Sequence, residues 1–179
     1  MANVYRNISI HGLGDLVCKT RSGQDLNAGR RRYNDIPEYT GTELSHQDAV
    51  RKATTYASFA SRHELYLDRA VETGAAPYSI ALLDYLEAPR VLQIDVDAWT
   101  GEIGQTIRVK ARDSVGVAAV SLVIRDAQGN LLETGDAVQA GAGSPWWHYM
   151  TRARIPVTPF PGVEAIARDL PGNQTSFTI

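Results

Sequence analysis

The sequence contains very little sulfur, with one cysteine and two methionines among 179 residues. A single cysteine excludes an internal disulfide and any zinc or iron–sulfur site built from several cysteines. Cys18 lies in an alternating segment between Val17 and Lys19, where a small buried side chain is a commoner role than a catalytic nucleophile. We therefore expect packing and hydrogen bonds alone to stabilise the fold.

An excess of charge of one sign is also missing. The 18 Lys and Arg residues nearly balance the 20 Asp and Glu residues, so the formal net charge is -2. Because no overall positive field attracts a polyanion, we expect no nucleic-acid partner. No apolar run approaches the ~20 residues of a membrane-spanning helix, so we expect no membrane insertion. Residues 1–16 show no basic segment followed by an apolar one, so we predict no signal peptide.

Sequence motifs for catalysis and cofactor binding are absent. The sequence holds four scattered histidines, which are His11, His46, His63 and His148. They form no HExxH, HxH or Cys-His pattern, and the sequence has no nucleophile elbow, P-loop or G-x-G-x-x-G. We therefore predict that the protein is not an enzyme and needs no cofactor.

The N-terminal part has the pattern of a small β-meander. Residues 4–10 and 15–20 alternate between polar and apolar side chains, with a glycine-containing turn between them, and Ser22 and Gly23 give a second turn signal. Two or three short strands bury too little apolar surface to be stable alone. We expect them to pack on the rest of the chain or on another copy.

Helical periodicity follows. Ser45 and Asp48 are spaced as in a capping box, which predicts a helix that begins near Ser45. Apolar residues, many of them alanine, then recur at intervals of three and four until Gly74, which is predicted to end the helix. Pro77 suits the first turn of a second helix that continues to Glu87. The alanine-rich face is expected to let another element approach closely.

From residue 90 onwards the hydrophobic period changes from about 3.6 residues to two. The segments that alternate are 91–97, 106–112, 117–125, 131–134, 146–155, 163–168 and 175–179. Turn residues separate them at the spacing of an antiparallel sandwich. We predict an α+β chain, with a small β-meander and helical region in residues 1–89 and a seven-stranded β-sandwich in residues 90–179.

Three segments of the C-terminal half carry a resemblance. They are Ala111-Arg112-Asp113-Ser114-Val115-Gly116-Val117, Trp146-Trp147-His148-Tyr149 and Ala167-Arg168-Asp169-Leu170-Pro171-Gly172-Asn173. In order and composition they resemble the motifs of bacterial immunoglobulin-like domains, which implies an immunoglobulin-like sandwich over about half of the chain. Asp113 and Asp169 are expected to accept backbone amides within their own turns.

The N-terminal half contains the strongest local charge run, Arg30, Arg31 and Arg32. Together with Pro37 and a helix that opens near Gln47, this half is similar to certain uncharacterised bacterial proteins that also place a sandwich at the C-terminus. That resemblance implies no activity. We expect the three arginines to bind an acidic partner face or to form ion pairs within the chain.

The aromatic run of residues 146–149 is a candidate binding surface. In a strand, Trp147 and Tyr149 share one face, while Trp146 and His148 share the other, so one tryptophan should enter the core. Trp147 and Tyr149 are the candidate binding residues, and a recognition module that binds a protein or a glycan through them requires them to face outwards. The alternative left open is that the helices or the meander cover the outer tryptophan.

Four aspartates are weak candidates for a calcium site. Asp95 and Asp97 share one strand face, and Asp113 or Asp169 could approach them at one end of the sandwich. The sequence has no dense acidic loop, so an ordinary solvated face with two turn aspartates is the competing interpretation, and we predict no bound metal.

These observations favour a non-enzymatic structural subunit that self-associates or docks on a larger particle, such as a surface, filament or phage-like assembly. Its expected partners are other copies of the chain, with a glycan as a possible ligand. The alternative is a monomeric recognition module that uses the exposed aromatics of the sandwich. Immunoglobulin-like sandwiches are usually exported, so synthesis in the cytoplasm followed by incorporation into an extracellular or virion-like particle would reconcile the fold with the missing signal peptide.

Overall fold

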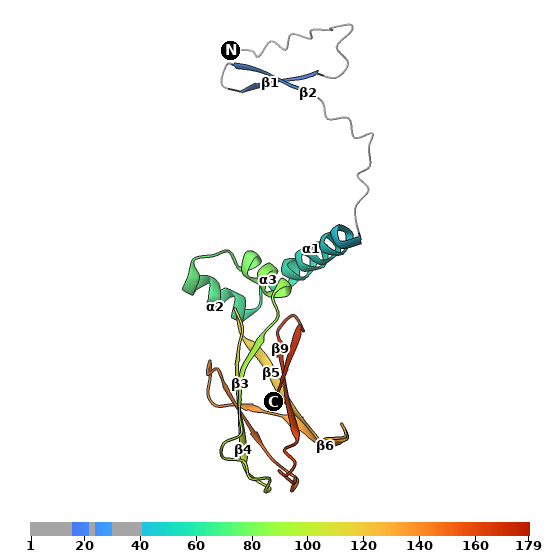
Figure 1. Ribbon diagram of the computed structural model, residues 1–179. Helices are drawn as coiled ribbons and strands as arrows, with labels where there is room; N and C mark the ends of the chain where they lie inside the picture. The colour runs from blue at the N-terminus through green and yellow to red at the C-terminus, as the bar shows by residue number, and fades with distance from the viewer. Residues whose placement is uncertain (1–15, 22–23, 30–40) are drawn as a thin grey trace. The chain divides into compact units, whose positions relative to one another are not determined.

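The computed structural model describes residues 16–21, 24–29 and 41–179 (Figure 1). The chain divides into two compact units, Met1–Thr42 and Glu43–Ile179. In the first unit, β1 (Leu16–Arg21) pairs antiparallel with β2 (Gln24–Gly29). The strand predicted over residues 15–20 is confirmed. Residues 4–10 and 30–32 lie outside the described residues, so the complete meander and the roles of Arg30, Arg31 and Arg32 stay predictions.

Three helices occupy the part of the chain between residues 41 and 86 that the structure describes. They are α1 (Gly41–Ala60), α2 (Glu64–Thr73) and α3 (Pro77–Leu86). None of these described helices is long and apolar enough to span a membrane. Helix α3 begins at Pro77 as predicted, and Gly74, with φ 72°, ends α2 as predicted.

The single helix predicted from Ser45 to Gly74 is wrong in two respects. The helix begins earlier, at Gly41, and it is interrupted after Ala60. At the interruption His63 caps α2, because its Nδ1 accepts a hydrogen bond of 3.3 Å from the Leu65 amide. Side-chain capping offers the backbone a local alternative to a continuous helix.

The second unit contains a β-sandwich of two antiparallel four-stranded sheets, in the orders β3-β4-β8-β7 and β10-β9-β5-β6. Its strands are β3 (Arg90–Asp95), β4 (Thr106–Arg112), β5 (Val117–Arg125), β6 (Leu131–Asp136), β7 (Val138–Gln139), β8 (Trp146–Met150), β9 (Gly162–Asp169) and β10 (Gln174–Thr178). Each predicted segment contains a strand. Within residues 90–179 the structure adds one that was not predicted, β7, so the sandwich has eight strands rather than seven, and β8 ends before the predicted Ile155.

The core lies between the two sheets and is built from alternate residues of their strands. The fully buried side chains include Ile107, Val109, Val120, Leu122, Ile124, Val163, Ala165 and Ala167. Their regular alternation with half-buried or exposed residues is the reason the period of two predicted this part of the fold. At one end, Gly101 has φ 90°, and a Cβ built there would lie 2.1 Å from the Ile155 carbonyl oxygen. Only glycine fits that position.

The helices lie at the end of the sandwich where β3 begins (Figure 1). Their own core is small, with Ala57, Tyr66 and Ala81 buried, and Val115 and Leu170 of the sandwich pack against it. The alanine-rich face therefore packs within this chain, against α2, α3 and two sandwich loops. The helices and the sandwich belong to the same compact unit.

Candidate functional site

Strand β8 places the aromatic run, and its orientation is the reverse of the one that binding through Trp147 and Tyr149 requires. Trp147 is 7% exposed and Tyr149 is 1% exposed, so both belong to the core. The register explains this, because Trp147 lies opposite Val109 and Tyr149 lies opposite Ile107, which are both fully buried on β4. The structure therefore does not support Trp147 and Tyr149 as exposed binding residues.

Tyr149 belongs to a buried hydrogen-bond network. Its hydroxyl donates to Glu133 Oε1 at 2.6 Å, and the same carboxylate accepts the backbone amides of Arg152 at 2.7 Å and Ala153 at 3.0 Å. Burial raises the pKa of Tyr149, and the hydrogen bond to Glu133 raises it further. Gly135 packs on the ring, since a Cβ there would lie 2.9 Å from it. The network connects β6 to β8, and the hydrogen of the Tyr149 hydroxyl is used in the bond to Glu133.

Trp146 is the aromatic residue of segment 146–149 that faces away from the core, and the side chains of Arg108 and Lys110 lie over its ring. The Arg108 guanidinium carbon lies 5.6 Å from the centre of the Trp146 ring, and Lys110 Nζ lies 5.5 Å from it. Such cation–π contacts are typical of Trp. The sequence did not reveal this cluster, because the pairing of Lys110 with Trp146 depends on the register of β4 and β8.

The four aspartates of the candidate calcium site do not converge. In the pairing of β3 with β4, Asp95 lies opposite Arg108 while Arg90 lies opposite Arg112, so Asp95 and Asp113 are at opposite ends of the strand pair. The Asp97 amide and Arg108 hold the pKa of Asp95 below its usual value. Among the described residues, no group of three His, Cys, Asp or Glu side chains could hold a metal ion. The structure therefore does not support the weak candidate of a calcium site formed by Asp95 and Asp97 with Asp113 or Asp169.

Asp113 and Asp169 act as turn acceptors, as predicted. Asp113 Oδ2 accepts the amides of Val115 at 3.0 Å and Gly116 at 3.1 Å. Asp169 Oδ1 accepts the amides of Gly172 at 2.8 Å and Asn173 at 2.6 Å. Burial raises the pKa of Asp169, and these hydrogen bonds oppose the rise.

A buried acid that the sequence did not predict, Asp84, lies at the junction of the helices with the sandwich. Its side chain is fully buried, its Oδ2 accepts a 2.6 Å hydrogen bond from the Tyr66 hydroxyl, and its Oδ1 has no hydrogen-bond partner among the described residues. The Tyr56 and Tyr66 hydroxyls lie 2.8 Å apart. Burial raises the pKa of Asp84 to about 7, and the nearby Asp113 and Asp169 carboxyls add to the rise. The sequence signal for the burial of Asp84 was its position three residues after Ala81 in an otherwise apolar helix.

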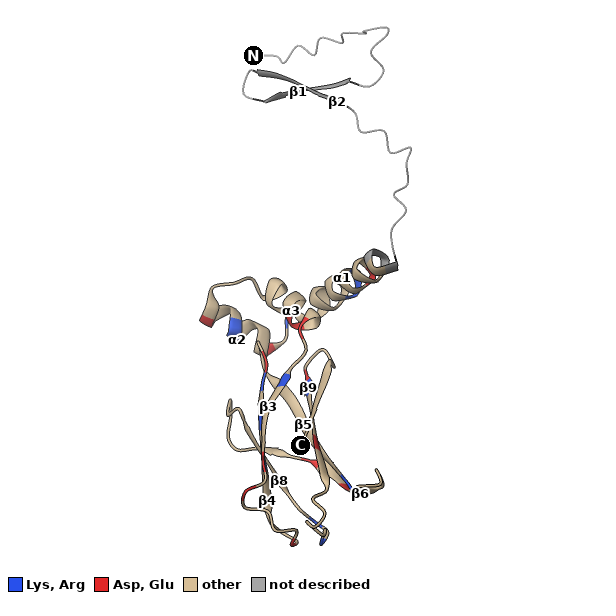
Figure 2. Ribbon diagram, viewed as in Figure 1, with Lys and Arg blue, Asp and Glu red and all other residues tan. Residues whose placement is uncertain are grey.

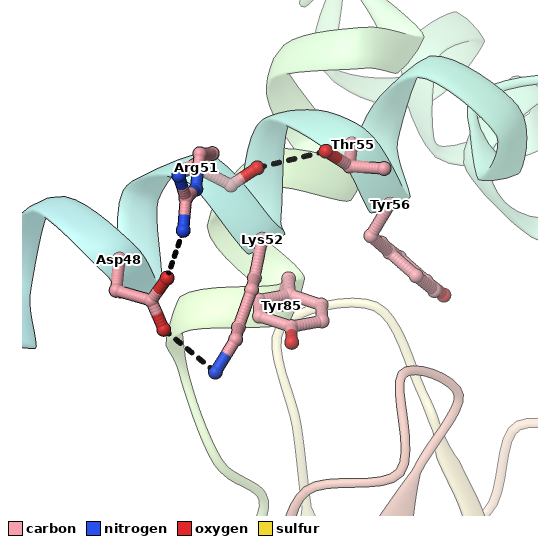
Figure 3. A pocket seen from close by; sticks show the side chains of 6 residues that line it. All are labelled: Asp48, Arg51, Lys52, Thr55, Tyr56 and Tyr85. Carbon is pink, nitrogen blue, oxygen red and sulfur yellow. Dashed lines mark hydrogen bonds and ion pairs between the residues drawn. The ribbon is translucent and has the colours of Figure 1, made fainter.

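A shallow hollow of about 440 Å³ lies against α1 and α3 (Figure 3). Asp48 forms ion pairs of 2.7 Å with both Arg51 and Lys52, and Tyr85 closes one side. Hydrogen bonds from Lys52 and Arg51 lower the pKa of Asp48. Because Asp48 pairs with both cations, the charged residues of the lining keep one uncompensated positive charge, which is a weak attraction for a ligand in so open a hollow.

A larger groove, of about 670 Å³, lies between α2 and the sandwich. Arg69 and Leu65 of α2 line one wall, and Lys110 and Arg112 of β4 line the other. Trp147 contributes to the lining from the core side, and its indole N–H has no hydrogen-bond acceptor among the described residues.

The helices expose a large share of their apolar side chains. The exposed fractions are 80% for Phe59, 46% for Leu67, 88% for Val71, 40% for Tyr78, 55% for Leu83 and 42% for Leu86. Within α3 only Ala81 and Asp84 are buried. Apolar side chains are therefore exposed on each of the three described helices.

No family model and no curated protein matches the sequence. Among solved structures, the chain is similar to the crystal structure of CopC from Methylosinus trichosporium OB3b, with a TM-score of 0.36 and 13% identity over 50% of this chain and 87% of that chain. The two antiparallel sheets themselves define the C-terminal part as a β-sandwich.

Proposed function

We propose that the chain is a non-enzymatic assembly subunit that self-associates through its helices and uses the sandwich as a rigid support. The apolar surface of the helices carries this proposal. Phe59, Val71 and Leu83 are 80%, 88% and 55% exposed, whereas the fully buried apolar residues in the described parts of the helices are three alanines and one tyrosine, namely Ala53, Ala57, Ala81 and Tyr66. A helix with apolar side chains on several faces normally packs through those faces against other elements or another chain.

A second copy of the chain is the partner that fits this surface best. Leu67 and Val71 lie one turn apart on α2, and Leu83 and Leu86 lie one turn apart on α3, so each helix presents an apolar ridge. Ridges of this kind pack against identical ridges across a twofold axis, the commonest symmetry of soluble oligomers. A surface, filament or virion-like particle is the setting that we propose for such a subunit.

We also propose that the sandwich is immunoglobulin-like, as the sequence motifs imply. The sheet order β3-β4-β8-β7 corresponds to the A-B-E-D sheet of that fold, and β10-β9-β5 corresponds to G-F-C, with β6 as an additional strand beside β5. This strand order is consistent with a scaffold role for the sandwich, and it identifies no catalytic or ligand-binding residue. With Trp147 and Tyr149 in the core, a recognition module based on those two aromatics has lost its support.

The proposal is tested by light scattering of the full-length chain over a wide concentration range. We expect the mass to rise above 19.6 kDa with concentration in the natural sequence. A double variant, Val71→Glu and Leu83→Glu, should remain a monomer, because both side chains are exposed and the added charges oppose burial in an interface.

Val138→Glu is the matched control, since Val138 is 73% exposed but lies on β7 of the sandwich. It should associate like the natural sequence. A natural chain that stays monomeric at every concentration, or a control that loses association as fully as the double variant, would refute the helical interface.

A further inference from the structure

The groove between α2 and the sandwich carries an excess of positive charge. Among the described residues that line it, Arg69, Lys110 and Arg112 are basic, and Asp113 is the one acid. Arg69 forms a 2.8 Å ion pair with Glu72 of α2, so Lys110 and Arg112 carry the charge that is left for a ligand. Asp113 uses its carboxylate within its own turn, where Oδ2 accepts two backbone amides. Figure 2 shows basic residues on α2, β3 and β4 in this part of the molecule.

Arg112 occupies an unfavourable position in the sheet. It lies directly opposite Arg90 in the pairing of β3 with β4, both side chains are exposed, and neither forms an ion pair with any described residue. Like charges directly opposite each other destabilise a strand pair. An anionic ligand beside Arg112 would relieve that repulsion.

Apolar side chains stand next to these cations. Leu92 is 50% exposed and lines the groove, because a register shift between Val91 and Gln93 interrupts the pairing of β3 at that residue. Leu65 is 45% exposed and lies one turn before Arg69 on the same face of α2. The groove therefore combines apolar walls with positive charge, which suits a ligand that carries both apolar groups and carboxylates.

The spacing of the cations indicates the shape of such a ligand. Lys110 and Arg112 are two residues apart on the outer face of β4, which places their Cα atoms about 7 Å apart. Carboxylates at alternate positions of an extended peptide have the same separation. We propose that this groove binds an extended acidic peptide segment of a partner protein, with carboxylates against Lys110 and Arg112 and an apolar side chain against Leu65 and Leu92.

This site is separate from the surface proposed for self-association. At about 100° per residue, Leu65 points more than 100° away from both Leu67 and Val71 on α2. The two surfaces can therefore be disabled independently. The Val71→Glu and Leu83→Glu double variant should still bind the acidic peptide, even though it should no longer self-associate.

The test is an NMR titration of the isotope-labelled full-length chain with the blocked peptide Ac-Glu-Leu-Glu-Leu-Glu-NH2. We expect amide shifts confined to the groove, around Leu65, Leu92 and residues 110–118, and weaker binding at high salt. The same peptide with glutamine in place of glutamate should bind at least about five-fold more weakly, because it loses the same ion pairs. The double variant Lys110→Gln and Arg112→Gln should bind about five-fold more weakly, the size expected for two partly exposed ion pairs.

Arg168→Gln is the matched control, because Arg168 is an exposed arginine on β9 of the other sheet. It should bind the peptide like the natural chain. The proposal is overturned if millimolar peptide shifts no amide signals of the groove, or if the glutamine peptide binds as tightly as the glutamate peptide. It is also overturned if Arg168→Gln weakens peptide binding as much as the Lys110→Gln and Arg112→Gln double variant does. A sulfated glycan without apolar groups that binds the groove more tightly than the peptide would also overturn it and would assign the site to anionic glycans.

Discussion

Asp84 is fully buried on α3, where its carboxyl group accepts a hydrogen bond from Tyr66 and forms no ion pair within the described part of the chain. A buried carboxyl without a cation is more stable in its protonated form. The raised pKa of about 7 therefore makes this one side chain a source of pH dependence at the junction.

We predict that Asp84→Asn becomes stabilising, relative to the natural sequence, as the pH rises. Below pH 4 the carboxyl is protonated in both the folded and the unfolded chain. Between about pH 4 and pH 7 the unfolded chain loses this proton while the folded chain keeps it, so the free energy of unfolding of the natural protein falls by up to about 1.4 kcal/mol per pH unit. Above pH 7 the loss is complete. Thermal or urea unfolding of both proteins from pH 4.5 to pH 8 measures this difference.

Asp126→Asn is the control for this experiment. The Asn130 side chain and nearby backbone amides hold the pKa of Asp126 below its usual value, so this carboxyl is ionised in the folded and the unfolded chain above pH 5. Its variant should differ from the natural protein by a constant amount over the same range. An Asp84→Asn difference that is equally flat would contradict the assignment of a buried, raised carboxyl.

The orientation of single residues was the least predictable feature of the sequence. The alternation of residues 146–149 correctly separated Trp147 and Tyr149 from Trp146 and His148. Which pair faces the core depends on the register between β4 and β8, because a slip by one residue exchanges the two faces. No local signal in the sequence fixes that register.

At the scale of elements, Asn173 connects the turn between β9 and β10 to the end of α3. Its Nδ2 lies 3.2 Å from the carbonyl oxygens of Asp84, Tyr85 and Glu87, and 2.8 Å from Asp169 Oδ2. The last carbonyls of a helix have no partners within the helix. The Asn173 amide has two hydrogens, so it serves two of these four acceptors at a time and caps part of the C-terminal end of α3.

We predict that Asn173→Ala loosens α3 without unfolding the sandwich. The loss of a donor that leaves buried carbonyls unpaired costs about 1–3 kcal/mol. Hydrogen exchange should increase in α3, while the β4, β5 and β9 amides keep their protection. Asn130→Ala, which removes a 2.8 Å contact to Asp126 in an exposed turn, should leave the exchange of α3 unchanged. Equal exchange of α3 in the natural protein and in Asn173→Ala would contradict this role.

The sequence predicted the long strands of the sandwich better than the interruption of the helix or the short strand β7. The strands of the sandwich followed from a period of two, because each has one face in the core. The interruption of the helix after Ala60 was missed, because residues 61–63 contain neither glycine nor proline and the His63 cap resembles an ordinary helical residue in sequence. Strand β7 is two residues long and shows no period at all.

For the whole molecule, the sequence predicted an α+β chain but could not show where copies would meet. It allowed contacts between copies at the N-terminal strands, and it predicted only a close approach of some other element at the alanine-rich helix face. In the structure that face packs within the chain, since Ala53 and Ala57 are fully buried, and larger apolar side chains of the helices are exposed instead. The proposed interface therefore lies within residues 59–86.

We predict that a fragment of residues 41–179 folds on its own and still self-associates. The buried residues of both the helical core and the sandwich core fall within this range. The fragment should unfold in a single cooperative transition and show a mass that increases with concentration, because it retains Phe59, Val71 and Leu83. Calorimetry and light scattering measure the two properties. A fragment that folds but stays monomeric, while the full chain associates, would instead place the assembly contacts in residues 1–40, where the β-meander was predicted.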